Sequence, residues 1–335
     1  MATNILPFGA ATSVRVSDLL SGMRDNSRPA TAVATRFPTG MQPLDDVLGG
    51  GFQPQDLVLI TGRPGVGKTI TALQWARATA MRDLDAIYVC YEHSPQALLA
   101  RLLALEIASA AAPEQMHAVD HLTQRAQEVV FGSESLDAIM DEPLVADAFE
   151  RVRSYSRRLL LVQASGRGTD VEAIDRIVSD FVQPVAVFVD YLQKVPTRPA
   201  LNDEHERSTL LAESLKELAM TRNAVVVAIA AADRAALYER RLRLRHMRGS
   251  SALAYEADVV VVLNDKAVAV SKSHLAYDPV RAEQYRRMLV LSIEKHRSGP
   301  ADLDMEFVKD FGHYRLLPHG SFLTEKLVDD ILYLD

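Results

Sequence analysis

The feature that most constrains this chain is a glycine-rich loop between an apolar run and a helical stretch. The segment LVLITGRPGVGKT covers residues 57–69 and contains the pattern G-x-x-x-x-G-K-[ST]. Its glycines let backbone N–H groups turn inward around an anion, and the helix that follows points its positive end at the same place. The flanking strand and helix argue against a chance match in an ordinary turn. The residues expected to hold a nucleotide are Gly62, Arg63, Pro64, Gly65, Val66, Gly67, Lys68, Thr69 and Ile70.

The chemistry of such a loop specifies its ligands. We expect Lys68 to reach the β- and γ-phosphates of ATP, and the Thr69 hydroxyl to ligate Mg²⁺. ATP and Mg²⁺ are therefore the predicted cofactors.

Composition places the chain among ordinary globular proteins. It has 335 residues, of which 48% are hydrophobic and 24% charged, which suits one large domain or two modest ones. The single cysteine, Cys90, allows no disulfide framework within the chain, and no apolar run approaches the about 20 residues of a membrane span. We expect a cytoplasmic protein without a membrane segment. The net charge of −7 means that nucleic-acid binding would depend on local basic patches.

Apolar runs of strand length alternate with helical stretches along the chain. This alternation predicts an α/β fold with a mainly parallel, twisted sheet and helices on both faces. The expected strands follow the phosphate loop at residues 86–91, 159–162, 185–189, 224–230, 258–263, 289–293 and 303–307. Gly62, Glu92 and Asp190 each stand just past the end of an apolar run. Because ligands bind at the carboxyl ends of parallel strands, all three are expected at one nucleotide.

Two carboxylates are candidates for the hydrolytic chemistry. Asp190 closes the run VAVFV, so it is predicted to bind Mg²⁺ together with Thr69. The next residue, which is the base in many phosphate-loop ATPases, is Tyr191, and a phenol is not a base at neutral pH. Glu92 is therefore the best candidate for the base. The alternative is an exposed carboxylate at the helix cap with Ser94, and His93 beside it is interpreted as incidental.

One basic cluster stands out in an otherwise acidic chain. The stretch RAALYERRLRLRHMR covers residues 234–248 and contains Arg240, Arg241, Arg243, Arg245 and Arg248. Such side chains could follow the phosphate backbone of single-stranded DNA. A solvated helix face or an arginine-rich subunit interface is the alternative for the cluster, and only Tyr238 is nearby as a stacking platform.

The domain organisation predicted from these patterns has three parts. Residues 1–35 form an N-terminal tail with a short amphipathic helix at residues 16–23, which either folds back or docks on a neighbouring subunit. Residues 36–320 form the ATPase domain. Residues 321–335 form an acidic C-terminal tail.

Five blocks in order resemble the RecA-like motor domain of DnaB-type replicative helicases over roughly residues 36–316. They are RPGVGKT, YEHSPQALLARLLALE, VFVDYLQKV, MRGSSALAYEADVVVVL and IEKHRSGP. The resemblance implies a RecA-like P-loop NTPase in which Glu92 occupies the catalytic glutamate position and Lys68 the catalytic lysine of the loop. It further implies that Lys295 and Arg297 act on the ATP of the adjacent subunit, where they stabilise the charge of the transition state. Two solvated bases before a turn are the alternative for this pair.

The resemblance also implies partners. A residue supplied in trans requires a head-to-tail interface, which closes into a ring, here expected to be a homohexamer. Arg248, Gly249 and Ser251 are expected in the DNA-contacting loop, and residues 240–245 in the loop before it. Residues 16–23 look similar to the linker helix that packs on the next subunit.

Two departures separate this chain from the replicative members. Ala231 stands where the family usually has a glutamine that senses the γ-phosphate, and the chain has no room for the N-terminal helical domain. We therefore expect a specialised relative. Three functions fit: a ring motor on single-stranded DNA, a regulatory or recombination ATPase similar to KaiC or RadA, and a structural ring in which ATP supports assembly. A protein partner could dock on the acidic tail in the last two.

Overall fold

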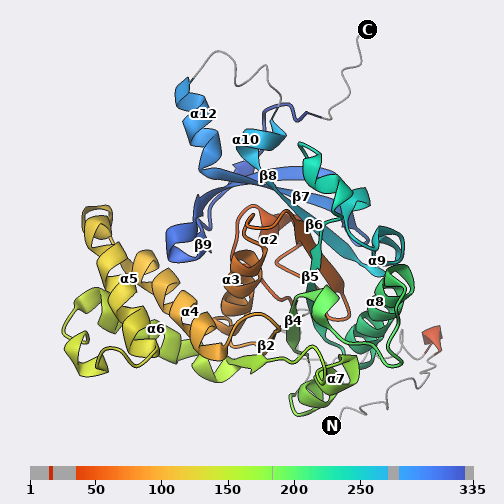
Figure 1. Cartoon of the computed structure of the whole chain (residues 1–335), viewed down its shortest axis with the longest axis horizontal. Coiled ribbons are helices and arrows are strands. Elements are labelled where there is room, and N and C mark those ends of the chain that lie inside the picture. The colour runs from red at the N-terminus through yellow and green to blue at the C-terminus, as the bar shows by residue number, and fades with distance from the viewer. Residues whose placement is uncertain (1–14, 18–34, 183, 271–278, 329–335) are drawn as a thin grey trace.

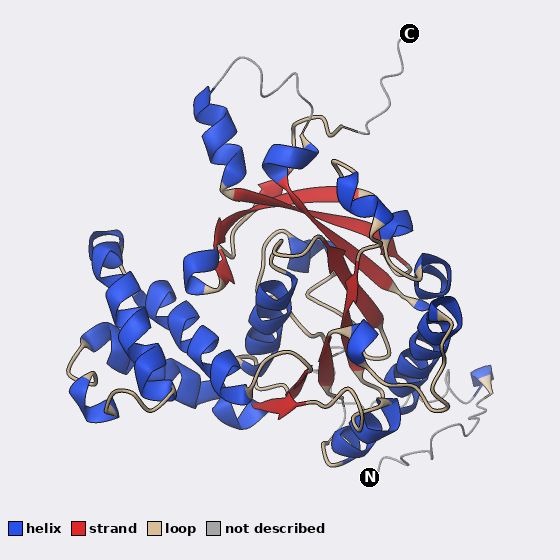
Figure 2. Ribbon diagram, viewed as in Figure 1, coloured by secondary structure: helices blue, strands red, loops and turns tan. Residues whose placement is uncertain are grey.

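The computed structural model describes residues 15–17, 35–182, 184–270 and 279–328. A single twisted sheet crosses the molecule (Figures 1 and 2). Its strands lie in the order β10-β8-β7-β6-β1-β5-β4-β2-β3, with β9 paired to β8. The strands are β1 (Leu57–Gly62), β2 (Ala86–Cys90), β3 (Leu159–Gln163), β4 (Ala186–Asp190), β5 (Val225–Ala231), β6 (Val259–Asp265), β7 (Met288–His296), β8 (Leu303–Asp310), β9 (Arg315–Leu316) and β10 (Ser321–Phe322).

The α-helices are spread along the described chain. They are α2 (Leu44–Val47), α3 (Lys68–Ala80), α4 (Pro95–Ala110), α5 (Met116–Val130), α6 (Pro143–Tyr155), α7 (Val171–Ser179), α8 (Glu204–Thr221), α9 (Ser250–Glu256), α10 (Lys266–Ala269) and α12 (Pro279–Arg286). The predicted strands are all present, with ends shifted by a few residues.

The parallel part of the sheet contains β6, β1, β5, β4, β2 and β3. Its central strands are continuous apolar runs because both of their faces are buried. Successive side chains of β1 alternate between two hydrophobic cores, with Val58 and Ile60 in one and Leu57 and Leu59 in the other. Helices α3 and α4 contribute to the first core, and α7, α8 and α9 to the second. The α/β architecture with helices on both faces is therefore confirmed.

The sheet continues beyond β6 with antiparallel strands. β7 pairs with β6, β8 with β7, and β10 with β8, all antiparallel. β7 and β8 are joined by a short turn, whereas α10 and α12 lie between β6 and β7. The continuation brings β7, with Lys295 near its end, alongside the strand that follows α9.

The helices α5 and α6 form a lobe at the left of Figure 1. They pack with the end of α4 around a small core of their own that includes Ile107, Val119 and Val145. The predicted helical character of residues 110–158 agrees with this lobe.

The two ends of the chain differ in how much of them the structure describes. The predicted N-terminal helix at residues 16–23 lies largely outside the described residues. At the other end, β10 joins the sheet, Glu325 accepts a hydrogen bond from Lys266 (2.9 Å), and Leu327 is buried. Part of the predicted acidic tail thus packs on the body of the protein.

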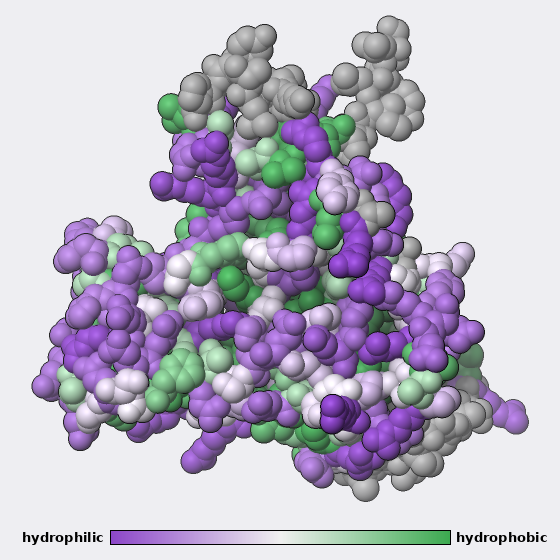
Figure 3. All heavy atoms as spheres, viewed as in Figure 1, coloured by the Kyte–Doolittle hydropathy of each residue, from purple (hydrophilic) through white to green (hydrophobic). Residues whose placement is uncertain are grey.

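The surface in view is dominated by hydrophilic residues, with hydrophobic ones in small groups (Figure 3). Among the helices that the structure describes, we find none that combines the length and the apolar character of a membrane span.

Candidate nucleotide-binding site

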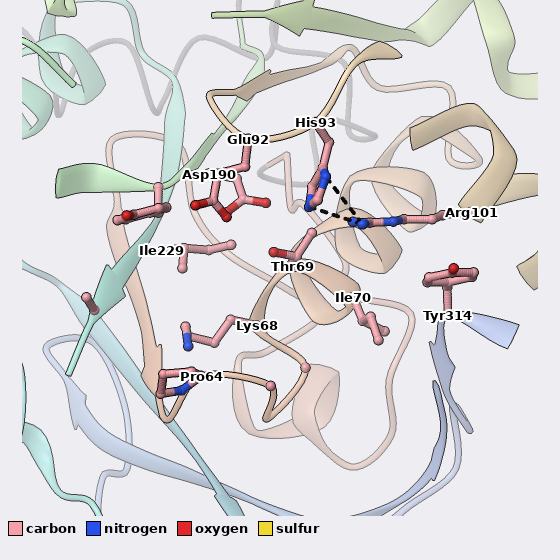
Figure 4. Close-up of a pocket in the computed structure, with 14 residues that line it drawn as sticks. Pro64, Lys68, Thr69, Ile70, Glu92, His93, Arg101, Asp190, Ile229 and Tyr314 are labelled. Atoms are coloured by element: carbon pink, nitrogen blue, oxygen red, sulfur yellow. Dashed lines mark hydrogen bonds between the residues drawn. The ribbon is translucent and has the colours of Figure 1, made fainter. Parts of the chain in front are cut away.

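A pocket of about 460 Å³ lies at the carboxyl ends of β1, β2, β4 and β5 (Figure 4). Most of the residues predicted for nucleotide, metal and catalysis meet there. The lining residues are Pro64, Gly65, Gly67, Lys68, Thr69, Ile70, Glu92, His93, Arg101, Asp190, Tyr191, Ile229, Ala231 and Tyr314. Three predicted loop residues contribute differently, since Gly62 and Arg63 offer backbone carbonyls and Val66 is buried in the core.

The glycines give the loop its shape. Gly65 and Gly67 have φ angles of +78° and +101°, which favour glycine. A Cβ at Gly67 would also lie 2.5 Å from the ring of Phe311. Gly67 is the N-cap of α3, so the positive end of this helix faces the pocket. The geometry is that of an anion site, as the sequence predicts.

Lys68 is the cation of the pocket. Its Nζ donates to the carbonyl oxygens of Gly62 and Arg63, both at 2.8 Å. Burial lowers its pKa to about 8, although Asp190 and Glu92 act in the opposite direction. The amine is therefore held at the loop. With a pKa of about 8, it begins to lose its charge slightly above neutral pH.

This pKa predicts that nucleotide affinity depends on pH. Phosphate oxygens stabilise the charged amine and raise its pKa, so binding takes up a proton above about pH 8. We expect the Kd of a non-hydrolysable ATP analogue to be flat below that pH. Above it, the Kd should rise by up to about tenfold per pH unit. Isothermal titration between pH 7 and pH 9.5 measures this. Lys68→Met should bind weakly with no such rise, and a wild-type profile that is flat to pH 9.5 would contradict the assignment.

The acidic side of the pocket is built from the ends of β2 and β4. Asp190 is 2% exposed, and its carboxylate accepts a hydrogen bond from the Tyr88 hydroxyl at 3.0 Å. Burial raises the pKa of Asp190 and Glu92 adds to the rise, whereas hydrogen bonds from the hydroxyls of Thr69 and Tyr88 oppose it. A buried carboxylate beside a second one is stabilised by a cation, and oxygen ligands suit Mg²⁺. Thr69 and Asp190 therefore fit the predicted metal.

No dedicated metal cage is needed for that role. Among the described residues, no group of three or more His, Cys, Asp or Glu side chains could hold a metal ion. Mg²⁺ in nucleotide sites keeps several waters and is held by one or two protein ligands with the substrate phosphates. Two oxygen donors at the phosphate loop agree with that arrangement.

Glu92 follows β2 and faces the pocket. The helix cap that offered an alternative role is made by Ser94, whose Oγ accepts from the Ala97 N–H at 3.2 Å. Glu92 is exposed, and its carboxylate lies beside that of Asp190 in the pocket (Figure 4). This position suits a base that orients water.

Three pocket residues were missed as site residues by the sequence interpretation. Arg101 lies over the Tyr314 ring, 5.3 Å from its centroid, and its guanidinium lies 3.1 Å from Nε2 of His93. Burial and the charge of Arg101 lower the pKa of His93, so the imidazole is neutral at pH 7. Nothing local in the sequence marks Tyr314, which arrives from the turn after β8. The only available signal for Arg101 is that its helix, α4, begins three residues after Glu92.

Lys295 and Arg297 lie outside the pocket of their own chain. The Lys295 Nζ donates to the carbonyl of Ala254 at 2.6 Å, and Arg297 pairs with Asp258 at 3.2 Å. Burial, followed by the charge of Arg297, lowers the pKa of Lys295. The Arg297 side chain is 46% exposed. The two cations therefore share one partly exposed surface at the end of α9.

The arginine cluster divides into inward and outward members. Arg241 is 6% exposed and donates to Asp304 at 2.7 Å, and Arg243 pairs with Glu294 at 2.6 Å. Arg240 donates to the Val270 carbonyl at 3.0 Å. The burial of Arg241 argues against its predicted contact with DNA, because its charge is already neutralised inside the subunit.

The remaining members of the predicted DNA surface lie outward. Arg245 and Ser251 are exposed and line a surface depression together with Arg243. Arg248 is 43% exposed on its side chain and pairs with Glu204 at the start of α8, with NH2 2.5 Å from Oε2. Gly249 has a φ of +77°, and a Cβ there would lie 2.4 Å from the Ser208 hydroxyl. Gly249 is therefore required by the packing of its loop on α8.

Two known proteins illustrate the sequence similarity of this chain. The replicative DNA helicase DnaB of Leifsonia xyli subsp. xyli is 26% identical over 300 residues, which cover 88% of this chain and 58% of that protein. The DNA repair protein RadA of Synechocystis sp. is 37% identical over 108 residues, which cover 32% of this chain and 21% of that protein. The chain thus spans only about half to two-thirds of the length of the DnaB relatives that it matches.

A solved structure shares the fold. The ATPase domain of G40P superposes with a TM-score of 0.69 at 19% identity, covering 91% of this chain and 99% of that domain. The family profile described as the DnaB-like helicase C terminal domain matches residues 37–315. With that match over most of its length, the chain belongs to the DnaB-like helicase C-terminal domain family.

Proposed function

We propose that this protein hydrolyses ATP and works as a ring-forming motor that binds single-stranded DNA. The observation that carries the proposal is the division of the catalytic groups. The phosphate loop, Asp190 and Glu92 meet in one pocket, whereas Lys295 and Arg297 lie on a separate surface of the same chain.

The pocket accounts for the chemistry of hydrolysis. Glu92 accepts a proton from water as the water oxygen attacks the γ-phosphorus, and the bond to the β–γ bridging oxygen breaks to leave ADP and phosphate. Lys68 neutralises charge on the phosphate oxygens. Thr69 and Asp190 would hold Mg²⁺, which would neutralise charge on the phosphates.

The far end of the pocket suits a nucleotide base. Tyr314 offers an aromatic face beside the Arg101 guanidinium, and both groups stack readily on flat rings. Arg101 and Tyr314 lie on the opposite side of the pocket from Lys68 in Figure 4, so a base held at Tyr314 would leave its triphosphate toward the loop.

The separate surface requires a second subunit. Lys295 and Arg297 can act on a phosphate only if their surface meets the pocket of a neighbour. That contact is heterologous, and repeated head to tail it closes into a ring when the rotation between subunits allows. We propose a homohexamer on this basis and on the resemblance to the DnaB family.

The proposed DNA surface is the loop that contains Arg245, Arg248 and Ser251. Exposed arginines and backbone N–H groups in the central loops of a ring can follow a phosphate backbone. In this structure the guanidinium of Arg248 is paired with the carboxylate of Glu204. A DNA phosphate would therefore compete with Glu204 for the same donors.

The proposal is tested by the ATPase rate with and without a single-stranded oligonucleotide at about 50 mM and about 200 mM salt. We expect several-fold stimulation at the lower salt and less at the higher, because phosphate contacts weaken as counterion release becomes less favourable. A rate that ignores DNA at both salts would refute the motor.

Two variants on one ion pair sharpen that test. Arg248→Ala should weaken oligonucleotide binding and reduce its salt dependence by about one phosphate contact. Glu204→Gln keeps the shape of its side chain but frees Arg248, so it should bind the oligonucleotide several-fold more tightly at low salt. If both variants bind like the wild type, this loop is not the DNA surface.

A regulatory or recombination ATPase is the second candidate. The match to RadA over a third of the chain favours it. In that case ATP should change assembly or partner binding, measured by light scattering, and DNA should leave the hydrolysis rate unchanged.

A further inference from the structure

The end of β5 joins the nucleotide pocket to the Arg248 loop. Ala231 is the last residue of β5 and lines the pocket. Its side chain, a single methyl group, has no polar atom for a phosphate. Its backbone, however, is hydrogen-bonded on both sides. The Ala231 N–H donates to Oε1 of Gln193 at 3.0 Å, and the Ala231 carbonyl accepts from the Arg248 N–H at 3.0 Å.

Gln193 belongs to the segment that follows the metal-binding strand. It lies in the short 3₁₀ turn at Leu192–Lys194, three residues after Asp190. Helix α8 holds this turn in place, because Arg207 of α8 donates to the carbonyls of Gln193 at 2.8 Å and Val195 at 2.7 Å. A change at Asp190 can therefore reach Ala231 over a short, rigid path.

The loop on the other side of Ala231 is equally tied. The Asp233 N–H donates to the His246 carbonyl at 2.8 Å, and Ala232 forms a bridge with Met247. With the bond from Arg248 to Ala231, these contacts continue β5 as a short antiparallel ladder. Because Ala231 lines the pocket and accepts from the Arg248 N–H, a displacement of Arg248 would also displace Ala231.

We infer that Gln193 is a positioning residue that couples the occupancy of the nucleotide pocket to the position of the Arg248 loop through the backbone of Ala231. The path runs from Asp190 through the 3₁₀ turn to Oε1 of Gln193, then across one peptide group to Arg248. It supplies a connection that the methyl group at position 231 cannot make. The inference deepens the proposed function, on which it rests for the identity of the two ligands.

The experiment is hydrogen–deuterium exchange of the peptide that contains residues 244–250, with and without a saturating non-hydrolysable ATP analogue and Mg²⁺. In the wild type the analogue should change the exchange rate of this peptide by at least about threefold, since the Arg248 N–H donates within the ladder. Gln193→Ala removes the acceptor, so the analogue should still bind but leave the peptide unchanged. Gln193→Glu keeps an acceptor oxygen and should restore the response.

A matched control is Gln124→Ala on the exposed face of α5, which should respond like the wild type. Three results would overturn the inference: no response in the wild type, a full response in Gln193→Ala, or no response in Gln193→Glu. Because this readout needs neither DNA nor hydrolysis, its failure is distinct from a failure of DNA to stimulate the ATPase.

Discussion

Glu92→Gln should reduce the kcat for ATP hydrolysis by about 10²- to 10⁴-fold, the range of a general base. The substitution keeps the size of the side chain but removes its ability to accept a proton from water. Because Tyr191, next to the proposed Mg²⁺ ligand Asp190, is a phenol, it cannot replace the carboxylate as the base. Single-turnover hydrolysis in the presence of Mg²⁺ measures the effect.

Nucleotide binding should survive the same substitution. Glu92 opposes the binding of an anion, and its charge adds to the raised pKa of Asp190. Its neutralisation should therefore leave the Kd of an ATP analogue equal to or below the wild-type value. Glu114→Gln, at an exposed turn before α5, is the matched control and should retain full activity. Normal turnover by Glu92→Gln would show that Glu92 is not the base.

Local signals in the sequence were sufficient for the centre of the fold. The run Leu57–Gly62 is buried along its whole length, so its apolar character predicts a central strand, and the loop after it has a fixed spacing. Asp190 and Glu92 were predicted as site residues in the same way, and the structure places Asp190 at the end of β4 and Glu92 two residues after β2. The side-chain period of a strand and the burial of a parallel sheet make such signals visible over a few residues.

Residues brought together over long distances could not be predicted. Tyr314 reaches the pocket from a turn far along the chain, and the contact of Gln193 with Ala231 spans 38 residues. The arginine cluster shows the same limit. Arg241 and Arg248 look alike in the sequence, yet one is buried against Asp304 and the other lies outward. Which arginine faces solvent depends on the carboxylates that β8 and α8 place beside them.

Arg297→Ala should reduce the kcat by about 10³-fold or more if its guanidinium stabilises the transition state on a neighbouring subunit. The fold should tolerate the change, because Asp258 keeps its pair with Lys216 at 2.6 Å. The thermal unfolding temperature should therefore stay close to that of the wild type. Arg286→Ala, on the exposed side of α12, is the matched control and should keep full activity.

If Arg297 acts on the ATP of a neighbouring subunit, mixing two inactive variants should restore ATP hydrolysis. Arg297→Ala subunits keep an intact pocket, and Lys68→Ala subunits keep an intact Arg297. Each variant alone should be inactive. Mixed under conditions that allow subunit exchange, they should form rings in which about a quarter of the interfaces combine an intact pocket with an intact Arg297. Hydrolysis should then reappear in the mixture. If the mixture stays as inactive as its components, Arg297 acts on its own chain, and the division of the catalytic groups between two subunits fails with it.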